Sequence, residues 1–189
     1  MHRCDWTKND EKMNHYHDTE WGVPVHDDLK HFEFLVLDAF QAGLSWKSVL
    51  YKRENFREAF DGFNPAIVAE YTDADFERLM QTEGIIRNKL KIKNTISNAR
   101  QFLRIQQLYG SFDHYIWQFT HGKTIVNSWE DSKKVPAFTQ QSDEMSYDLK
   151  KEGFKFVGTT ICYAYMQAAG MVNDHVVNCF RYREINNMK

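Results

Sequence analysis

Apolar residues recur three and four positions apart along most of this chain, and the residues that break helices fall mainly between those stretches. The 189 residues include only 3 Pro and 9 Gly, and alternating strand patterns are nearly absent. We find no internal repeat and no linker-like composition. The pattern predicts an all-α fold in which both ends of the chain take part. Helices are expected at about 11–22, 27–42, 45–60, 64 onward, 72–82, 88–108, 111–119, 143–152, 160–169 and 174–180, with an irregular segment at 121–141 that includes a strand at 124–126.

Composition and charge narrow the class of protein. Apolar residues make up 42% and charged residues 26% of the chain, a mix that is typical of globular proteins and excludes disorder. No apolar run is long enough to cross a membrane, and the first residues lack an apolar signal segment, so we expect a cytoplasmic protein that binds no membrane. Three cysteines are an odd number and disfavour a disulfide framework. Because the net charge is −2, nucleic-acid binding would need a local basic patch.

Cysteine and histidine residues near the two ends of the chain have the chemistry of a zinc site. His175 and Cys179 are four residues apart, which on a helix places both on one face. Cys4 and His17 lie near the N-terminus, with His15 as a rival ligand. Two thiolates and two imidazoles fill a tetrahedral zinc shell and leave no position for water, so such a site would be structural. The alternative is that Cys4 is a surface thiol and the histidines are ordinary polar residues.

The first 46 residues carry many large aromatic side chains together with one acidic residue in an apolar helix. The aromatic residues are Trp6, Tyr16, Trp21 and Trp46. Asp38 falls in the helix expected at 27–42, which is apolar nearly all round and is therefore predicted to be buried. An aromatic wall with one acceptor suits a planar ligand that is cationic or donates hydrogen bonds. The alternative is that the tryptophans are core residues and that Asp38 is a structural carboxylate bonded to backbone amides or a hydroxyl.

A glycine turn between two expected helices has features of a phosphate-binding site. The turn consists of Gly84, Ile85 and Ile86, and a basic run follows it at Arg87, Lys89, Lys91 and Lys93. A turn that leads into a helix presents backbone N–H groups and a positive dipole end, which suits one DNA phosphate. The alternative is a solvated helix start, since a helix-hairpin-helix with a second glycine would be more specific.

Six segments of the chain together resemble the DNA-3-methyladenine glycosylase I family. They are 16–24 (YHDTEWGVP), 41–46 (QAGLSW), 52–55 (KREN), 84–87 (GIIR), 153–163 (GFKFVGTTICY) and 172–175 (VNDH). The similarity is collinear and extends from Cys4 to Cys179, which is nearly the whole chain. Several of these segments are long, so chance similarity is improbable.

The resemblance implies a fold, an activity and a metal. It implies a two-lobed, all-α member of the helix-hairpin-helix glycosylase superfamily, forming one domain over 1–189. One lobe would be 1–45 plus 110–189, with the zinc site joining the terminal segments, and the helix-hairpin-helix lobe would be 46–109. The family excises 3-methyladenine from alkylated double-stranded DNA by hydrolysing the N-glycosidic bond, releasing the free base and leaving an abasic site. One structural Zn²⁺ per chain would be bound by Cys4, His17, His175 and Cys179, and we expect a monomer.

The resemblance also assigns roles in the pocket. Trp46 would stack on the base, Trp6 and Trp21 would form walls, and Tyr16 would hydrogen-bond the base. Asp38 stands where the family commonly has Glu and would be the pocket carboxylate, acting with Tyr16 in catalysis. Met13 stands where we would expect an aromatic residue. Leu44 is the candidate wedge that fills the gap left by the flipped base, and Gly84, Ile85, Arg87 and Lys89 would bind DNA. The family lacks the aspartate that related glycosylases place after the hairpin, and we expect the nearby Asp113 to help begin a helix.

Three other functions stay open at this point. The chain could be a glycosylase for another, bulkier alkylated base, because the residues at 13 and 38 would enlarge the pocket. It could be a non-catalytic protein that binds DNA lesions. It could also be a purely structural helical domain with zinc, which would bind neither a base nor DNA.

Overall fold

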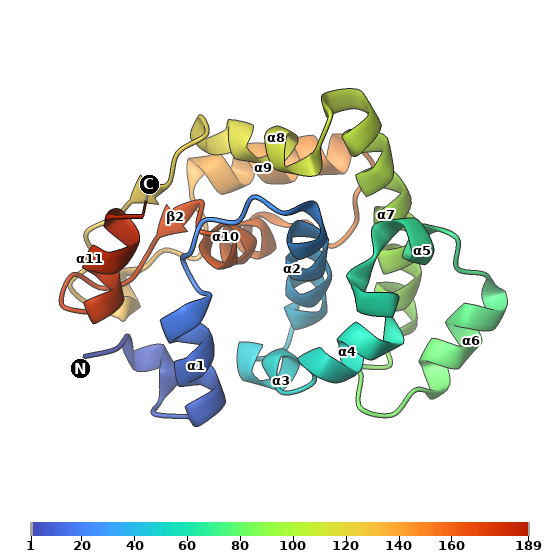
Figure 1. The fold of residues 1–189 in the computed structure, drawn as a ribbon, viewed down its shortest axis with the longest axis horizontal. Coiled ribbons are helices and arrows are strands. Elements are labelled where there is room, and N and C mark those ends of the chain that lie inside the picture. The colour runs from blue at the N-terminus through green and yellow to red at the C-terminus, as the bar shows by residue number, and fades with distance from the viewer. Residues whose placement is uncertain (1, 189) are drawn as a thin grey trace.

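The helix predicted to be buried, α2 (Asp28–Gln41), lies at the centre of the computed structural model, which describes residues 2–188 (Figure 1). Phe32, Leu37 and Phe40 on this helix have no exposed surface. The prediction of a buried helix is therefore confirmed. Its apolar neighbours carry Asp38 into the interior, where only 2% of that residue is exposed.

Helices joined by short turns make up most of the described chain, which confirms the all-α prediction. In chain order the elements are η1 (Asp5–Thr7), α1 (Glu11–Thr19), α2, α3 (Trp46–Leu50), α4 (Arg53–Ala59), η2 (Asp61–Phe63), α5 (Pro65–Ala69), α6 (Asp73–Gln81), α7 (Lys89–Tyr109), α8 (Phe112–Trp117), η3 (Gln118–Thr120), β1 (Ile125–Val126), η4 (Ser132–Lys134), α9 (Gln140–Lys151), α10 (Thr159–Ala168), β2 (Val172–Asn173) and α11 (Phe180–Asn186).

Most helix starts lie where the sequence offers a capping residue. The side chains of Asp10, Asp27, Ser45, Asn64 and Asn88 accept hydrogen bonds from backbone N–H groups in the first turns of their helices. Each of these bonds satisfies a donor that has no partner within the helix. The predicted starts of these five helices are therefore confirmed.

Two predicted helices are wrong: one is divided into two helices, and the other does not form. The helix expected at 45–60 is two helices, α3 and α4, because the backbone of Lys52 leaves helical geometry (φ −100°, ψ 1°). The helix expected at 174–180 does not form, since these residues are turns after β2 and α11 begins only at Phe180. The strand expected at 124–126 is present as β1. It pairs in parallel with β2, with Ile125 opposite Val172, a partner that the sequence did not indicate.

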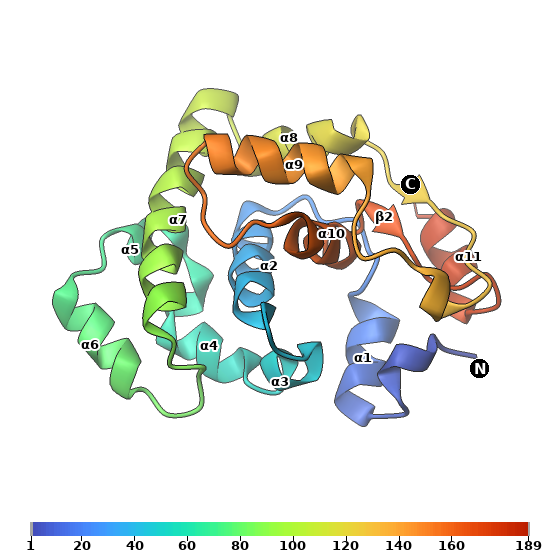
Figure 2. The same cartoon turned by 180° about the vertical axis from the view of Figure 1, so that it is seen from behind.

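Two groups of helices lie on either side of α2. Figures 1 and 2 show α4 to α7 on one side, α1, α11 and β2 toward the other end, and α8 and α9 across the top. The two terminal segments meet, since the Phe180 N–H donates to the His2 carbonyl at 3.1 Å. Within residues 2–188, no helix is both long and apolar enough to span a membrane.

Candidate active site and metal centre

The four predicted metal ligands meet in one buried cluster. Cys4, His17, His175 and Cys179 each present one ligand atom, and these atoms lie within 4.8 Å of one another. None of the four residues is more than 2% exposed. The rival His15 is exposed and lies outside the cluster. The expected helix is absent here, but the turn that replaces it still brings His175 and Cys179 to the same point.

The spacing of the ligand atoms fits a tetrahedral metal ion. The Cys179 Sγ lies 3.5 Å from His17 Nε2 and 3.5 Å from His175 Nδ1, and the Cys4 Sγ lies 3.7 Å from His175 Nδ1. Zinc bonds of about 2.3 Å to sulfur and about 2.0 Å to nitrogen, at a tetrahedral angle, separate the two ligand atoms by about 3.5 Å. The cluster therefore already has the dimensions of a Cys₂His₂ site.

Hydrogen bonds around the cluster fix both imidazoles with one nitrogen facing inward. His17 Nδ1 lies 2.8 Å from a carboxylate oxygen of Asp18, and His175 Nε2 lies 3.0 Å from the Trp21 carbonyl. Because both partners are acceptors, these outer nitrogens carry the protons. The inner nitrogens are then free to accept, which is the tautomer that binds a metal.

The two thiols of the cluster have opposite proton affinities. The hydrogen bond from Cys4 holds the pKa of Cys179 far below its usual range, and the bonds with His17 and His175 lower it further, against the effect of burial. The same pairing raises the pKa of Cys4. One thiol is therefore already stabilised as the thiolate that binds metals.

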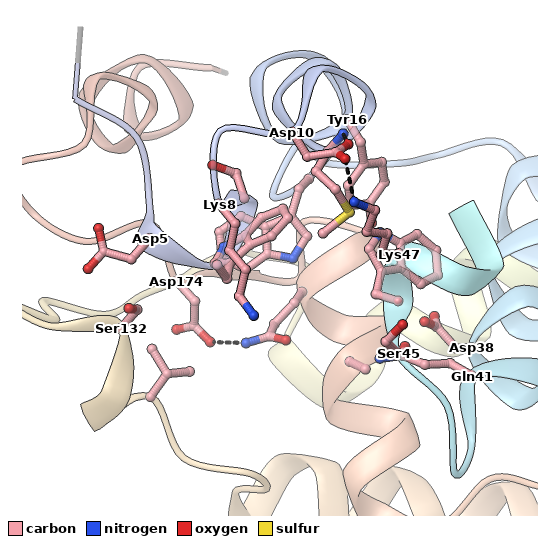
Figure 3. A pocket seen from close by; sticks show the side chains of 18 of the residues that line it. Asp5, Lys8, Asp10, Tyr16, Asp38, Gln41, Ser45, Lys47, Ser132 and Asp174 are labelled. Atoms are coloured by element: carbon pink, nitrogen blue, oxygen red, sulfur yellow. Dashed lines mark hydrogen bonds and ion pairs between the residues drawn. The ribbon is translucent and has the colours of Figure 1, made fainter. Parts of the chain in front are cut away.

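A cavity of about 890 Å³ is lined by the aromatic residues that the sequence singled out (Figure 3). Tyr16 and Trp46 lie with ring centroids 5.0 Å apart, and Trp6 and Trp21 are also 5.0 Å apart. These rings come from η1, α1, the turn after α1 and α3. The structure thus gathers the four aromatic residues around one space large enough for a purine base.

Asp38 lines this cavity without a protein partner for its inner oxygen. Its Oδ2 is buried and accepts no hydrogen bond from residues 2–188. No backbone amide or hydroxyl of residues 2–188 therefore holds this oxygen, as the alternative of a structural carboxylate would require. Burial raises the pKa of Asp38 well above the usual value, and the positive charge of Arg53 opposes this rise only in part.

Unpaired polar atoms concentrate at the cavity. Within residues 2–188, five buried side-chain nitrogen or oxygen atoms lack a hydrogen-bond partner, and three of them belong to cavity residues: Asp38 Oδ2, Trp6 Nε1 and Trp46 Nε1. Buried polar atoms are normally paired, so their clustering points to a ligand that supplies the partners. Such a ligand would offer a donor or positive charge to Asp38 and acceptors to the indoles.

Tyr16 and Met13 on α1 form the wall of the cavity next to Asp38. Burial and then the charge of Asp38 raise the pKa of Tyr16 well above its usual value, so its hydroxyl stays protonated and can donate. Met13 is 6% exposed and stands in the position where an aromatic residue was expected.

A buried ion network holds α1 and α2 together behind the cavity. The Arg53 guanidinium donates to both carboxylate oxygens of Glu20 at 2.8 Å, and its Nε donates to Glu33 at 2.8 Å. Glu20 follows α1, and Glu33 lies on α2. The network therefore sets the spacing between the helix that carries Tyr16 and the helix that carries Asp38.

The metal cluster and the cavity share a tryptophan. The ring of Trp21 lies edge-on to His175, with centroids 4.6 Å apart, and its carbonyl accepts the outer proton of that histidine. Trp21 also packs against Trp6 on the cavity wall. An ion bound at the cluster would therefore also hold the cavity wall in place.

The glycine turn lies between α6 and α7, as the sequence predicted, and Gly84 adopts a backbone conformation that favours glycine. Gly84 has φ +86°, and a Cβ there would lie 2.3 Å from Nδ2 of the Asn55 side chain. Ile85 is buried in the core, whereas Arg87 and Lys89 are exposed.

One lysine of the predicted basic run does not face solvent. Lys91 is buried, and its ammonium donates to the carbonyls of Phe40 and Ala42 at 2.9 and 2.6 Å. It therefore caps the C-terminal end of α2, where a positive charge is favourable. The Gly43 turn follows, with φ +78°, and leaves Leu44 45% exposed beside the cavity helices.

Several cavity residues were not found from the sequence. Asp174 accepts hydrogen bonds from four groups: Asn127, Trp129, Tyr163 and Gln167. Lys47 pairs with Asp10 at 2.6 Å on the opposite side. Asp10 was recognised only as a helix cap, and Asp174 lies within the 172–175 segment that carries the family resemblance. Nothing in the spacing of these residues indicates that they share a cavity.

Comparison with known proteins settles the family. Residues 6–182 match the family model described as methyladenine glycosylase. The chain belongs to the methyladenine glycosylase family. It is 48% identical over 182 residues to DNA-3-methyladenine glycosylase 1 of Escherichia coli (strain K12), which covers 96% of this chain and 97% of that protein.

Solved structures of the family have the same fold. A crystal structure of 3-methyladenine DNA glycosylase I matches with a TM-score of 0.92 and 49% identity, covering 95% of this chain and 98% of that one. A Y16F variant of a 3-methyladenine DNA glycosylase I in complex with 3-methyladenine matches with a TM-score of 0.92 and 33% identity, covering 95% and 97%. The fold predicted from the family resemblance is confirmed, and in this methyladenine glycosylase the buried Cys/His group could hold a metal ion.

Proposed function

We propose that this chain excises 3-methyladenine from alkylated double-stranded DNA by hydrolysing the N-glycosidic bond, which releases the free base and leaves an abasic site. The observation that carries the proposal is the unpaired Oδ2 of Asp38 in a cavity walled by aromatic rings. Relatives over nearly the full length are named DNA-3-methyladenine glycosylases, and one of them was solved in complex with 3-methyladenine.

The reaction needs little chemistry from the protein. Methylation at N3 makes adenine cationic, so the bond from C1′ to the base is weakened and the base leaves as a neutral molecule. Water adds to C1′ and loses a proton. The nucleotide must first leave the duplex stack, which costs a few kcal/mol and least for a damaged base.

Asp38 and Tyr16 are the polar groups that would contact the flipped base. Once ionised, Asp38 stabilises the positive charge that the methylated base and the sugar share along the reaction. Tyr16 stays protonated and donates a hydrogen bond. Trp46 stacks on the base, with Trp6 and Trp21 as walls. Asp113 takes no part, because its carboxylate is engaged by His26 and His31, each at 3.0 Å.

We assign a structural zinc ion to the cluster of Cys4, His17, His175 and Cys179. The donor set, the spacing of its atoms and the inward-facing histidine nitrogens all suit Zn²⁺. When bound, the ion supplies no chemistry to the reaction. It joins the N-terminal segment to the turn before α11 and thereby holds the walls of the cavity.

DNA binding would use the two lobes expected from the family. The glycine turn at Gly84 and Ile85 offers backbone N–H groups to a phosphate, and the exposed Arg87 and Lys89 add positive charge. Leu44, exposed on the turn after α2, would fill the gap left by the flipped base. The lobe at 46–109 would then contact one side of the lesion, and the lobe made of 1–45 and 110–189 would hold the base.

Release of bases from methylated duplex DNA tests the proposal. The protein is incubated with DNA carrying labelled methyl groups, and the released bases are separated by chromatography. Release of free 3-methyladenine without 7-methylguanine is expected. A folded protein that binds abasic DNA but releases nothing would indicate a lesion-binding protein instead. A protein that releases bases only from a second DNA substrate, carrying larger N3-alkyl adenines, would indicate a pocket adapted to bulkier adducts.

A further inference from the structure

Lys47 lies at the rim of the cavity and is held there by one anion. Its Nζ lies 2.6 Å from Asp10 Oδ2, and 56% of the lysine side chain is exposed. Figure 3 shows the ammonium directed at Asp10. Lys47 directly follows Trp46 in α3, so a nucleotide whose base stacks on Trp46 would place its backbone within reach of this lysine.

Asp10 does not depend on Lys47 for its hydrogen bonds. The same carboxylate accepts the Met13 N–H at 3.0 Å, as the cap of α1, and the Tyr51 hydroxyl at 2.8 Å. An exposed lysine–carboxylate pair contributes little to stability. Lys47 can therefore leave Asp10 for another anion while the carboxylate stays paired and the helix stays capped.

Under the proposed function, a phosphodiester is the anion that would reach this rim. The cavity has a buried inner end at Asp38 and Tyr16, and its exposed lining residues mark the mouth. A base at the inner end brings its sugar and two flanking phosphates to that mouth. Lys8 and Lys133 also line the mouth, are exposed, and have no ion partner among residues 2–188, so two further ammonium groups lie there, together with the exposed carboxylate of Asp5.

We propose that Lys47 exchanges Asp10 for a phosphodiester next to the flipped nucleotide, and that this exchange positions the nucleotide with its base on Trp46. The inference rests on the proposed function. Before DNA binds, the pair with Asp10 holds the ammonium at the rim, so that its charge does not neutralise Asp38 or repel a cationic base. After exchange, the same ammonium neutralises a phosphate.

Binding to an abasic duplex tests the contact. Affinity is measured by fluorescence anisotropy at several salt concentrations, using a labelled duplex with a tetrahydrofuran abasic analogue. Lys47→Met should bind about 5-fold more weakly at 0.1 M salt and lower the slope of log K against log salt by about 0.9, the loss of one phosphate contact. Lys151→Met is the matched control, because Lys151 is exposed and belongs to α9, a helix that lies across the molecule from α3 (Figure 1). A Lys47→Met protein that behaves like Lys151→Met overturns the proposal.

A double-mutant cycle with Asp10 tests the exchange itself. Asn also caps helices well, so Asp10→Asn keeps α1 and removes the charge. Asp10→Asn should raise DNA affinity about 2-fold in the protein that has Lys47. In the Lys47→Met protein it should have a smaller effect. The exchange is contradicted if Asp10→Asn changes DNA affinity equally in both proteins, or if it does not raise the affinity of the protein that has Lys47.

The same proteins separate this inference from the proposed function. If the wild type releases no 3-methyladenine from methylated DNA, the proposed function is wrong. If the wild type is active and Lys47→Met loses neither affinity nor salt dependence, only the role of Lys47 is wrong. Calorimetric titration with free 3-methyladenine checks that the Lys47→Met cavity is intact.

Discussion

The Cys/His cluster and the cavity lined by Asp38 are two buried polar regions, and they differ in whether their polar atoms have partners. In the cluster the inner atoms of Cys4, His17, His175 and Cys179 face one another, and the outer nitrogens of both histidines have acceptors. In the cavity the inner oxygen of Asp38 and two indole N–H groups have no partner within residues 2–188. A region whose polar atoms are satisfied stabilises the fold, whereas one that leaves them unsatisfied is built for a ligand.

The two regions meet on α1, which explains how stability at one can serve binding at the other. Tyr16 lines the cavity, and the next residue, His17, belongs to the cluster. The ring of Trp21 contacts His175 and continues the cavity wall. If the cluster holds the proposed zinc ion, loss of that ion should therefore weaken base binding, whereas loss of a cavity group should leave the ion bound.

The largest effect is expected from breaking the cluster. Cys179→Ser, or removal of the ion with a chelator, should lower the midpoint of thermal unfolding by about 10 °C, because metal binding contributes directly to folding free energy. It should also weaken binding of 3-methyladenine, since α1 and Trp21 lose their anchor. Calorimetric melting and elemental analysis of the same samples measure both quantities.

Cys162 provides the control for that variant. It is also buried, but its thiol donates to the Val157 carbonyl at 3.4 Å and lies outside the cluster. Cys162→Ser should keep one zinc per chain. Full metal content and unchanged melting in Cys179→Ser would show that the cluster binds no structural ion.

The second effect concerns the aromatic wall of the cavity. Trp46→Ala should weaken binding of free 3-methyladenine by about 10- to 100-fold, since stacking of a base on an aromatic ring contributes about 1–3 kcal/mol. Trp46→Phe keeps a ring and should lose much less. Isothermal titration calorimetry measures all three proteins, and equal affinity in the wild type and Trp46→Ala would place the base elsewhere.

The smallest expected effect is on stability, when the buried carboxylate of Asp38 is removed. Burial raises the pKa of Asp38 in the folded state above its usual value of 3.8, so folding is penalised increasingly as pH rises from about 4 through the raised pKa. Asp38→Asn removes this penalty and should raise the melting midpoint of the protein near neutral pH. The gain should vanish toward pH 4. A variant that is less stable than the wild type at all pH values would mean that the Asp38 carboxylate is structural.

The sequence predicted the chemistry of the site better than its local geometry. The four cluster residues were candidates by type and spacing, and the family resemblance selected them over the rival His15, yet the helix assumed for His175 and Cys179 is a turn. Short segments such as 174–180 are held by long-range contacts, here the Val177 N–H donating to the Trp129 carbonyl at 2.8 Å, and no local pattern encodes these.

The cavity also shows that local properties could be predicted from the sequence and long-range contacts could not. The buried helix and its aromatic neighbours could be predicted because apolar periodicity and residue type are local properties. The inward turn of Lys91 could not, since it depends on where the last carbonyls of α2 lie. The pairing of Asp10 with Lys47 could not be predicted either, because it joins the cap of α1 to the first turn of α3, which are far apart in sequence.

The central claim is that the unpaired carboxylate of Asp38 is kept for excision rather than for folding. Single-turnover release of 3-methyladenine from methylated duplex DNA, compared between the wild type and Asp38→Asn with melting measured on the same samples, tests it most directly. Release should be at least about 100-fold slower in the variant, and the stability of the variant should be equal or higher. Release at the wild-type rate by a folded Asp38→Asn protein would contradict it.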